Sequence, residues 1–179
     1  MFIIISGCSG VGKNTIIKEL LKKNNNIKMF KTCTTRKERQ EEKGNNLYIH
    51  LTKEEFENKI KNGELFEFEE IHGNLYGTLN SSIDEIKTSK SHFIKDIGVC
   101  GQSAFKQKLP SDVKTVSIFL YAPKEELIRR LTERGETEIE KRMERYEFEN
   151  SQVGNFDYVI NNDNIQSTLM QIENIIANN

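Results

Sequence analysis

Apolar residues recur along the chain with two spacings, and together they predict strands that alternate with helices. Runs of strand length that are rich in apolar residues occupy 2–6, 92–97 and 113–121. Ile and Leu recur at helical spacing directly after the first run, over 16–23, and again near the end, over 165–176. A buried strand followed by a helix that returns the chain is the repeating unit of a parallel sheet.

The remaining elements are shorter, and several of them fall in one mixed segment. Helices are expected over about 52–63, 81–90, 102–108, 123–133 and 138–150, and strands over 29–33, 47–49, 65–71, 75–78 and 158–160. Thr52 and Glu55 have the spacing of a capping box at a helix start. The order predicts an α/β sandwich with a parallel sheet, interrupted by a mixed insert at roughly 34–90.

A glycine-rich turn joins the first strand to the first helix. Residues 7–13 read G-C-S-G-V-G-K and fit the phosphate-binding pattern G-x-x-x-x-G-K. Glycines let backbone N–H groups approach a polyphosphate, the helix start is positively polarised, and Lys13 can reach the β- and γ-phosphates. Asn14 stands where Ser or Thr normally binds Mg²⁺, and its amide oxygen could serve instead, directly or through water.

Composition narrows the classes of partner. The 179 residues fit one domain, and 26 basic against 27 acidic residues give a formal net charge of −1. This balance argues against bulk binding to nucleic acid or to an anionic membrane, and no apolar run approaches the length of a membrane span. Cys8, Cys33 and Cys100 form neither a disulfide framework nor a metal spacing, so we expect free thiols in a reducing cytoplasm.

Charged side chains at two predicted strand ends suggest further phosphate chemistry. Arg36 and Arg39 follow one strand, and with the phenols of Tyr48 and Tyr76 they could form a second phosphate site. The alternative is a charged surface loop with two half-buried tyrosines. Asp96 ends another strand, where it could hold Mg²⁺ or simply begin a turn.

Two more features remain open from the residues alone. Glu67 lies between two phenylalanines, where it either faces solvent on an alternating strand or reads a base in a pocket. Arg134 interrupts a helical pattern near Arg130 and Arg142. These arginines could fork onto phosphate oxygens during phosphoryl transfer, or they could belong to a solvated helical face.

Taken in order, these segments resemble the guanylate kinase family over nearly the whole chain. The matching pieces are Ile5 to Thr15, Thr34-Thr35-Arg36, Arg39, Tyr48, Phe56, Glu67, Gly73 to Thr78, Asp96-Ile97, Arg130-Leu131, Arg134-Gly135, Lys141-Arg142 and Tyr158 to Asp163. The T-T-R and G-N-x-Y-G segments are specific to that family, whereas the phosphate loop is shared with many other nucleotide enzymes.

The resemblance implies a fold and an activity. The fold would be a P-loop NTPase three-layer sandwich with a parallel core sheet, a mixed α+β monophosphate-binding insert and a helical lid. Within a single kinase domain over 1–179, the core would take 1–33, 91–130 and 151–179, the insert about 34–90 and the lid about 131–150. The activity would be transfer of the γ-phosphoryl group of ATP, with Mg²⁺, to a nucleoside monophosphate such as GMP or dGMP.

The resemblance also implies roles for individual residues. The ATP site would use Gly7, Ser9, Gly10, Val11, Gly12, Lys13, Asn14, Thr15, Asn162 and Asp163. The GMP site would use Thr32, Arg36, Arg39, Tyr48, Glu67, Tyr76 and Thr78, with Glu67 and Thr78 reading the base. Lys13, Arg130, Arg134 and Arg142 would be catalytic, while Asn14 and, through water, Asp96 would hold the metal. The expected partners are ATP and the monophosphate, without nucleic acid or membrane, in a cytoplasmic protein that could form a homo-oligomer.

The sequence departs from the family pattern at the site itself. Where the family has D-I-D-x-Q-G, this chain has D-I-G-V-C-G, so Gly98 replaces an acid that helps to read guanine and Cys100 replaces the glutamine. We therefore expect looser discrimination between guanine and hypoxanthine. Two alternatives stay open: a non-catalytic guanylate-kinase-like binding domain, and a phosphate-loop kinase whose acceptor is IMP or another small phosphorylated molecule.

Overall fold

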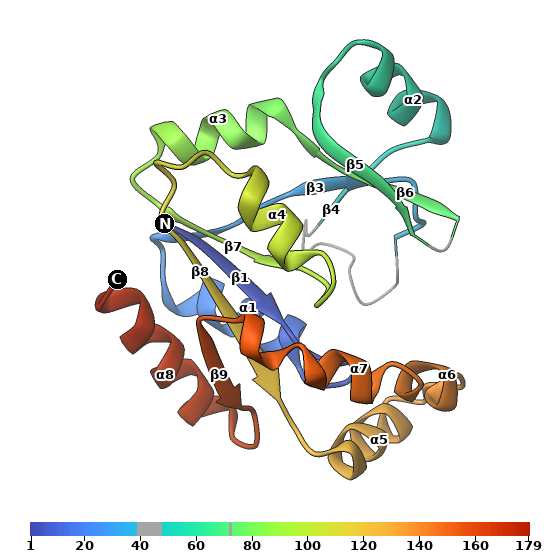
Figure 1. Cartoon of the computed structure of the whole chain (residues 1–179), viewed down its shortest axis with the longest axis vertical. Coiled ribbons are helices and arrows are strands. Elements are labelled where there is room, and N and C mark those ends of the chain that lie inside the picture. Colours follow the sequence, from blue (N-terminus) through green and yellow to red (C-terminus); the bar gives the residue numbers. More distant parts are fainter. Residues whose placement is uncertain (39–47, 72) are drawn as a thin grey trace.

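The computed structural model describes residues 1–38, 48–71 and 73–179, and these residues form two sheets (Figure 1). The core sheet has the strand order β2-β7-β1-β8-β9, and every neighbouring pair is parallel. Its strands are β1 (Phe2–Ser6), β2 (Ile27–Met29), β7 (His92–Asp96), β8 (Thr115–Tyr121) and β9 (Tyr158–Asn161). The predicted α/β fold with a parallel core sheet is therefore confirmed.

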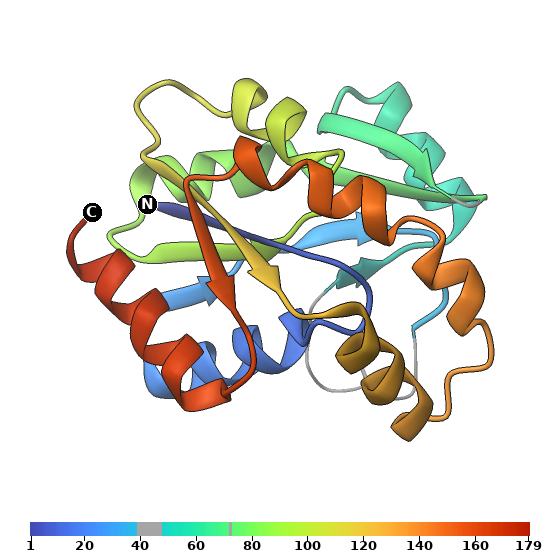
Figure 2. The ribbon, with the colours of Figure 1, turned by 60° about the horizontal axis from the view of Figure 1, so that its bottom comes forward.

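Helices cover both faces of the core sheet, because alternate residues of its central strand point into two separate cores. Ile3 and Ile5 of β1 pack with the apolar sides of α1 (Lys13–Lys23) and α8 (Ile165–Ala177). Phe2 and Ile4 face the opposite way and pack with residues of α3 (Asn80–Thr88) and α4 (Gln102–Lys108). Figure 2 shows the resulting three layers, with α1 and α8 below the sheet and α3 and α4 above it.

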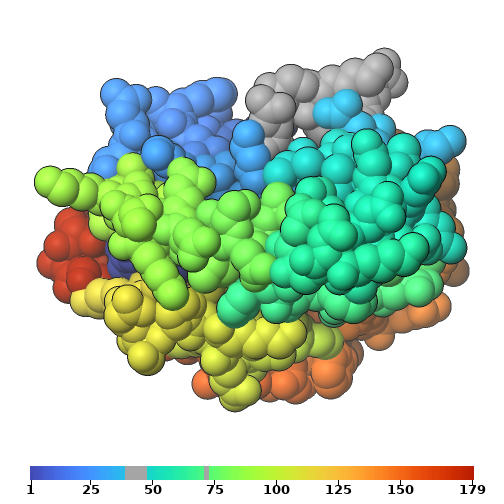
Figure 3. All heavy atoms as spheres, turned by 90° about the horizontal axis from the view of Figure 1, so that it is seen from above, coloured from blue at the N-terminus to red at the C-terminus, as the bar shows by residue number. Residues whose placement is uncertain are grey.

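The second sheet is smaller and mixed, with the order β4-β3-β6-β5. Its strands are β3 (Thr32–Thr34), β4 (Tyr48–His50), β5 (Leu65–Ile71) and β6 (Asn74–Leu79), and α2 (Lys53–Lys61) connects β4 to β5. The capping box expected at Thr52 is present, with Glu55 closing it. Figure 3 views this part of the molecule from above, where residues near 50–75 form one end of the surface. The exact division into core, insert and lid stays a prediction.

Two expected elements are divided in the structure. The strand predicted at 29–33 is two strands, β2 and β3, which belong to different sheets. Phe30 lies between them and is only 2% exposed, because its ring packs edge-on against Phe2 in the core as the chain crosses from one sheet to the other.

The helix predicted at 138–150 is also divided. It consists of α6 (Ile139–Met143) and α7 (Tyr146–Ser151), which follow α5 (Lys124–Glu133) and precede a short 3-10 helix (Val153–Asn155). The turn between α6 and α7 lets Met143 and Tyr146 both pack into the core cluster beneath them. Nowhere in 1–38, 48–71 or 73–179 does a helix combine the length and apolar character needed to cross a membrane.

Candidate active site

The glycine-rich turn between β1 and α1 has a backbone that only glycine accommodates readily. Gly7, Gly10 and Gly12 adopt φ values of 141°, 87° and 101°. A β-carbon on Gly7 would lie 2.3 Å from the carbonyl oxygen of Leu120 in the neighbouring strand. The turn delivers the chain directly into α1 at Lys13, so unpaired backbone N–H groups of the first helical turn face the same space as the loop.

Lys13 folds back over this turn. Its Nζ donates to the carbonyl oxygens of Gly7 at 2.6 Å and Cys8 at 3.2 Å. Burial lowers the pKa of this ammonium, while the nearby carboxylates of Asp96 and Glu149 act in the opposite direction. The sequence did not single out Glu149, which comes from α7 and is distant along the chain. The positive charge therefore sits at the mouth of the loop, held by backbone oxygens.

A pocket of about 710 Å³ opens beside the loop, and we call it the donor pocket. Most of the residues predicted to bind ATP line it: Ser9, Gly10, Gly12, Lys13, Asn14, Thr15, Asn162 and Asp163, together with Arg130, Arg134, Arg142 and Asp96. Gly7 and Val11 are buried behind its wall. Residues that are over a hundred positions apart in the sequence thus meet in one place.

The three arginines reach the donor pocket in different ways. Arg130 is engaged on every side: it donates from Nε to Glu126 at 2.7 Å, and from its two other nitrogens to the carbonyl oxygens of Val11 and Asn162 at 3.2 and 2.8 Å. Its guanidinium therefore joins α5 to the loop and to the end of β9.

Arg134 and Arg142 share one carboxylate. Glu136 lies 3.3 Å from a nitrogen of Arg134 and 2.6 Å from one of Arg142, and Arg142 also donates to Ser9 Oγ at 3.2 Å. The Nε of Arg142 is buried and has no hydrogen-bond partner in the described part of the chain. Sequence analysis missed Glu136, although an acid two residues after Arg134 was a visible signal for such a pair.

Asn162 connects the loop to the C-terminal helix. Its side-chain nitrogen donates to the Val11 carbonyl oxygen at 2.6 Å, and its side-chain oxygen accepts from Thr168 Oγ1 at 2.8 Å. The residue is only 4% exposed. Both ends of the amide are thus engaged within the protein, which makes Asn162 a support of the loop as well as part of the pocket wall.

A second, smaller pocket of about 230 Å³ lies against the mixed sheet, and we call it the acceptor pocket. Four of the residues predicted to bind GMP line it: Thr32, Tyr48, Glu67 and Tyr76. The rings of Tyr48 and Tyr76 lie 6.3 Å apart, and the guanidinium carbon of Arg36 lies 5.4 Å from the Tyr48 ring centre. Arg36 is not among the residues that line the pocket, and Arg39 lies outside the described residues.

Glu67 faces the acceptor pocket, so the sequence alternative of a fully solvent-facing acid does not hold. Thr78, on the neighbouring strand, donates its hydroxyl to Glu67 Oε1 at 2.6 Å. Thr78 is itself fully buried and does not line the pocket. The contact holds one carboxylate oxygen in place and leaves the other available.

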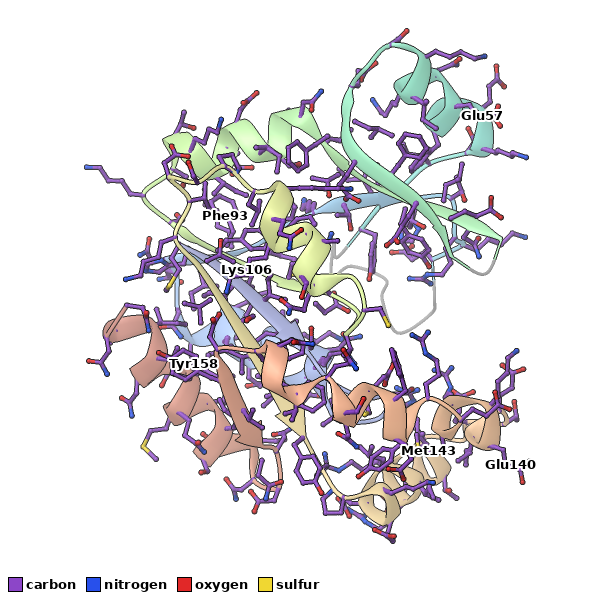
Figure 4. The ribbon with its side chains drawn as sticks, in the orientation of Figure 1. Glu57, Phe93, Lys106, Glu140, Met143 and Tyr158 are labelled. Carbon is purple, nitrogen blue, oxygen red and sulfur yellow. The ribbon has the colours of Figure 1, made fainter. Side chains whose placement is uncertain are left out.

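The two pockets adjoin each other. Asp96, at the carboxyl end of β7, lines both of them. Figure 4 shows the segment that carries α2, labelled at Glu57, and the segment that carries α6, labelled at Glu140, at opposite ends of the molecule. Gly98 and Lys95 line the acceptor pocket, and Lys95 is a residue that sequence analysis did not identify. Its signal was a lysine two residues after Phe93 in a strand predicted to be buried.

Comparison with known proteins agrees with this geometry. The family model described as guanylate kinase matches residues 1–179. The chain belongs to the guanylate kinase family. Among curated relatives, the guanylate kinase of Clostridioides difficile (strain 630) is 37% identical, covering 99% of this chain and 87% of the relative. That of Prochlorococcus marinus (strain MIT 9312) is 38% identical, covering 97% and 95%.

Solved structures give the same picture. The guanylate kinase of Anaplasma phagocytophilum superposes with a TM-score of 0.76 at 29% identity, over 99% of this chain and 84% of that one. A shikimate kinase from Bacteroides thetaiotaomicron superposes with a TM-score of 0.51 at 15% identity, a likeness of fold alone. The family resemblance that the motifs indicated is therefore confirmed.

Proposed function

We propose that this protein transfers the γ-phosphoryl group of ATP to GMP. One observation carries the proposal: two pockets of different size and chemistry adjoin at Asp96, one beside a phosphate-binding loop and one beside Glu67 and two tyrosines. Family membership favours this function over a non-catalytic binding domain, and the loop glycines and Lys13 that such a domain would not need are in place.

The donor pocket would bind the triphosphate through backbone N–H groups of residues 9–15. Lys13 would exchange its carbonyl partners for phosphate oxygens, which are stronger acceptors for an ammonium group. Arg134 and Arg142 would bring positive charge to the transferring group, while Arg130 holds the loop against α5. Such preorganised charges stabilise the transition state without a nucleophile or a general base from the protein.

The acceptor pocket would hold the monophosphate with its base against β5. The hydroxyls of Tyr48 and Tyr76, with Arg36 and Arg39, would hold the phosphate, and Glu67 would accept hydrogen bonds from the base. Adenine has no N1–H, so an adenine ring would leave the carboxylate unpaired at a cost of about 1–3 kcal/mol. Holding both substrates across Asp96 converts a bimolecular encounter into an aligned transfer.

Magnesium fits the oxygen donors of the donor pocket. Mg²⁺ usually combines phosphate oxygens and waters with one or two protein oxygens, and Asn14, Thr15 and Asp96 all line this pocket. The described residues contain no group of three or more His, Cys, Asp or Glu side chains able to hold a metal without the nucleotide. We propose that the ion arrives with ATP, where it would neutralise phosphate charge.

A kinase assay with a panel of acceptors tests the proposal. ADP formation from ATP and Mg²⁺ is measured with GMP, dGMP, IMP, AMP, CMP and UMP, and with no acceptor as the control. We expect ADP formation that depends on GMP or dGMP and stops when EDTA removes the metal. Absence of acceptor-dependent ADP formation with all six monophosphates would contradict the proposed function.

A further inference from the structure

Lys95 is a charged residue on a core-facing position. It follows Phe93 at the spacing of two that places both on one side of β7, and Phe93 is 2% exposed within the core beneath α3 and α4 (Figure 4). The Lys95 ammonium lies 4.8 Å from the ring centre of Phe105 and 5.7 Å from that of Phe30. The aliphatic part of the side chain thus lies along the rings of Phe30 and Phe105, and Lys95 lines the acceptor pocket.

The head of Lys95 faces carboxylates without pairing to them. Glu67 and Glu69 on β5 and Asp96 on β7 line the same pocket. Within residues 1–38, 48–71 and 73–179, no hydrogen bond or ion pair engages the Lys95 ammonium. Burial lowers its pKa to about 8, although Glu67, Asp96, Glu69 and the thiol of Cys33 act against this. An unpaired, partly desolvated cation in a binding pocket is costly unless a ligand completes its hydrogen bonds.

Thr78 cannot supply a hydrogen-bond donor to the base. A purine ring that presents N1–H to Glu67 presents its C6 oxo oxygen next to it, and that oxygen needs a donor. Thr78 has only one hydroxyl hydrogen, which goes to Glu67 Oε1. The side chain is also fully buried behind the pocket wall. Lys95 lines the same pocket as Glu67 and is less exposed than Lys108, the other lysine among the described residues of its lining.

We infer that Lys95 determines base specificity: its ammonium donates to the C6 oxo oxygen of the acceptor purine while Glu67 accepts from N1–H. This inference rests on the proposed function and extends it to the class of base. Adjacent donor and acceptor groups match the 6-oxo, N1–H edge that guanine and hypoxanthine share. Adenine presents the opposite pattern, an amine toward Lys95 and a bare nitrogen toward Glu67, so both contacts would be repulsive.

Gly98 extends the inference to the 2-position of the ring. Gly98 is exposed and lines the acceptor pocket, and a β-carbon built on it would meet nothing within 4 Å. No side chain at this position can accept from a 2-amine. The pair of Lys95 and Glu67 therefore reads the edge that GMP and IMP have in common, and the enzyme accepts both.

The Lys95→Met variant tests the inference, because methionine keeps an apolar stem over Phe30 and Phe105 and removes only the donors. We expect KM for GMP and for IMP to rise about tenfold or more, the usual effect of losing a hydrogen bond to a charged group. kcat and the KM for ATP should change less than twofold, and kcat/KM for AMP should not fall. Binding of GMP alone, measured by calorimetry without ATP or metal, should weaken by the same factor.

A control variant distinguishes a role in base recognition from a purely structural role of Lys95. Lys87→Met removes an exposed lysine of α3 that does not line the acceptor pocket, and it should leave the ratio of kcat/KM for GMP over AMP unchanged. The inference is overturned if Lys95→Met leaves KM for GMP unchanged, or raises KM for GMP, IMP and AMP equally, as a purely structural residue would. If the unmodified protein phosphorylates no monophosphate, the proposed function fails instead.

Discussion

The donor and acceptor pockets are built by different means. The donor pocket rests on one contiguous turn, residues 7–13, whose glycines bring backbone groups to the surface and whose lysine follows at once. The acceptor pocket has no such segment, and residues from five strands and one helix form it, including Thr32, Glu67, Tyr76 and Lys95. Backbone recognition suits a phosphate group, which every nucleotide carries, whereas side-chain recognition suits a base.

The difference predicts how each pocket responds to change. A backbone site keeps its shape when one side chain is lost, so a substitution there removes a charge and little else. A side-chain site depends on neighbours, such as the contact between Thr78 and Glu67, so a substitution there changes selectivity. Activity should therefore respond most strongly on the donor side, and selectivity on the acceptor side.

We expect the largest loss of kinase activity from the Lys13→Ala substitution. The ammonium is held by the carbonyl oxygens of Gly7 and Cys8, which solvent can satisfy after the substitution, so the fold should persist. The variant loses the mobile charge for the transferring phosphoryl, and kcat/KM for ATP should fall by about 100-fold or more. Steady-state kinetics with GMP held saturating measure this fall.

A matched control for Lys13→Ala is Lys18→Ala, a substitution farther along α1 and away from the pocket wall. The control should keep its activity, and circular dichroism should show the same helix content in both variants. If Lys13→Ala turned over normally, Lys13 would have no part in the mechanism.

A smaller effect is expected for Glu67→Gln on the acceptor side. The amide keeps an oxygen for Thr78 but is a weaker acceptor for N1–H, so kcat/KM for GMP should fall about tenfold to 100-fold. The KM for ATP should not change. Competition between GMP and AMP in one assay measures the loss of selectivity.

The control for Glu67→Gln is Glu70→Gln, an exposed acid on the same strand that does not line the pocket. It should leave selectivity intact. An equal fall in both variants would show that the net charge of β5, and not the position of Glu67, governs the acceptor.

The same contrast explains what the sequence could reveal. The alternation of strands and helices, the parallel core sheet and the phosphate loop follow from local signals: apolar runs, helical spacing and glycines in one short stretch. The split at Phe30 was not visible, since its burial depends on Phe2 and Phe105, which come from distant segments. The roles of Lys95 and Glu136 were missed for the same reason, because each depends on partners that only the fold brings near.

The glycine-rich turn of the donor pocket also depends on Asn162, which is distant from it along the chain. Its amide joins Val11 in the loop to Thr168 in α8, and its own carbonyl oxygen accepts from Arg130. A β-carbon on Gly12 would lie 2.8 Å from its nitrogen, so the amide also packs closely against the turn. The loop is thus encoded locally but supported by contacts about 150 residues away along the chain.

Asn162→Ala should produce the smallest change in activity and a clear change in stability. It leaves the buried Thr168 hydroxyl without its partner and removes one of the two donors to the Val11 carbonyl oxygen, which should lower the free energy of unfolding by about 2 kcal/mol. The KM for ATP should rise only a few-fold, because the backbone groups remain in place. Urea unfolding with linear extrapolation measures the first effect, and Asn161→Ala, at the exposed neighbouring position, is the control. If Asn162→Ala were as stable as the control yet had lost ATP binding, Asn162 would act through the nucleotide and the loop would need no distant support.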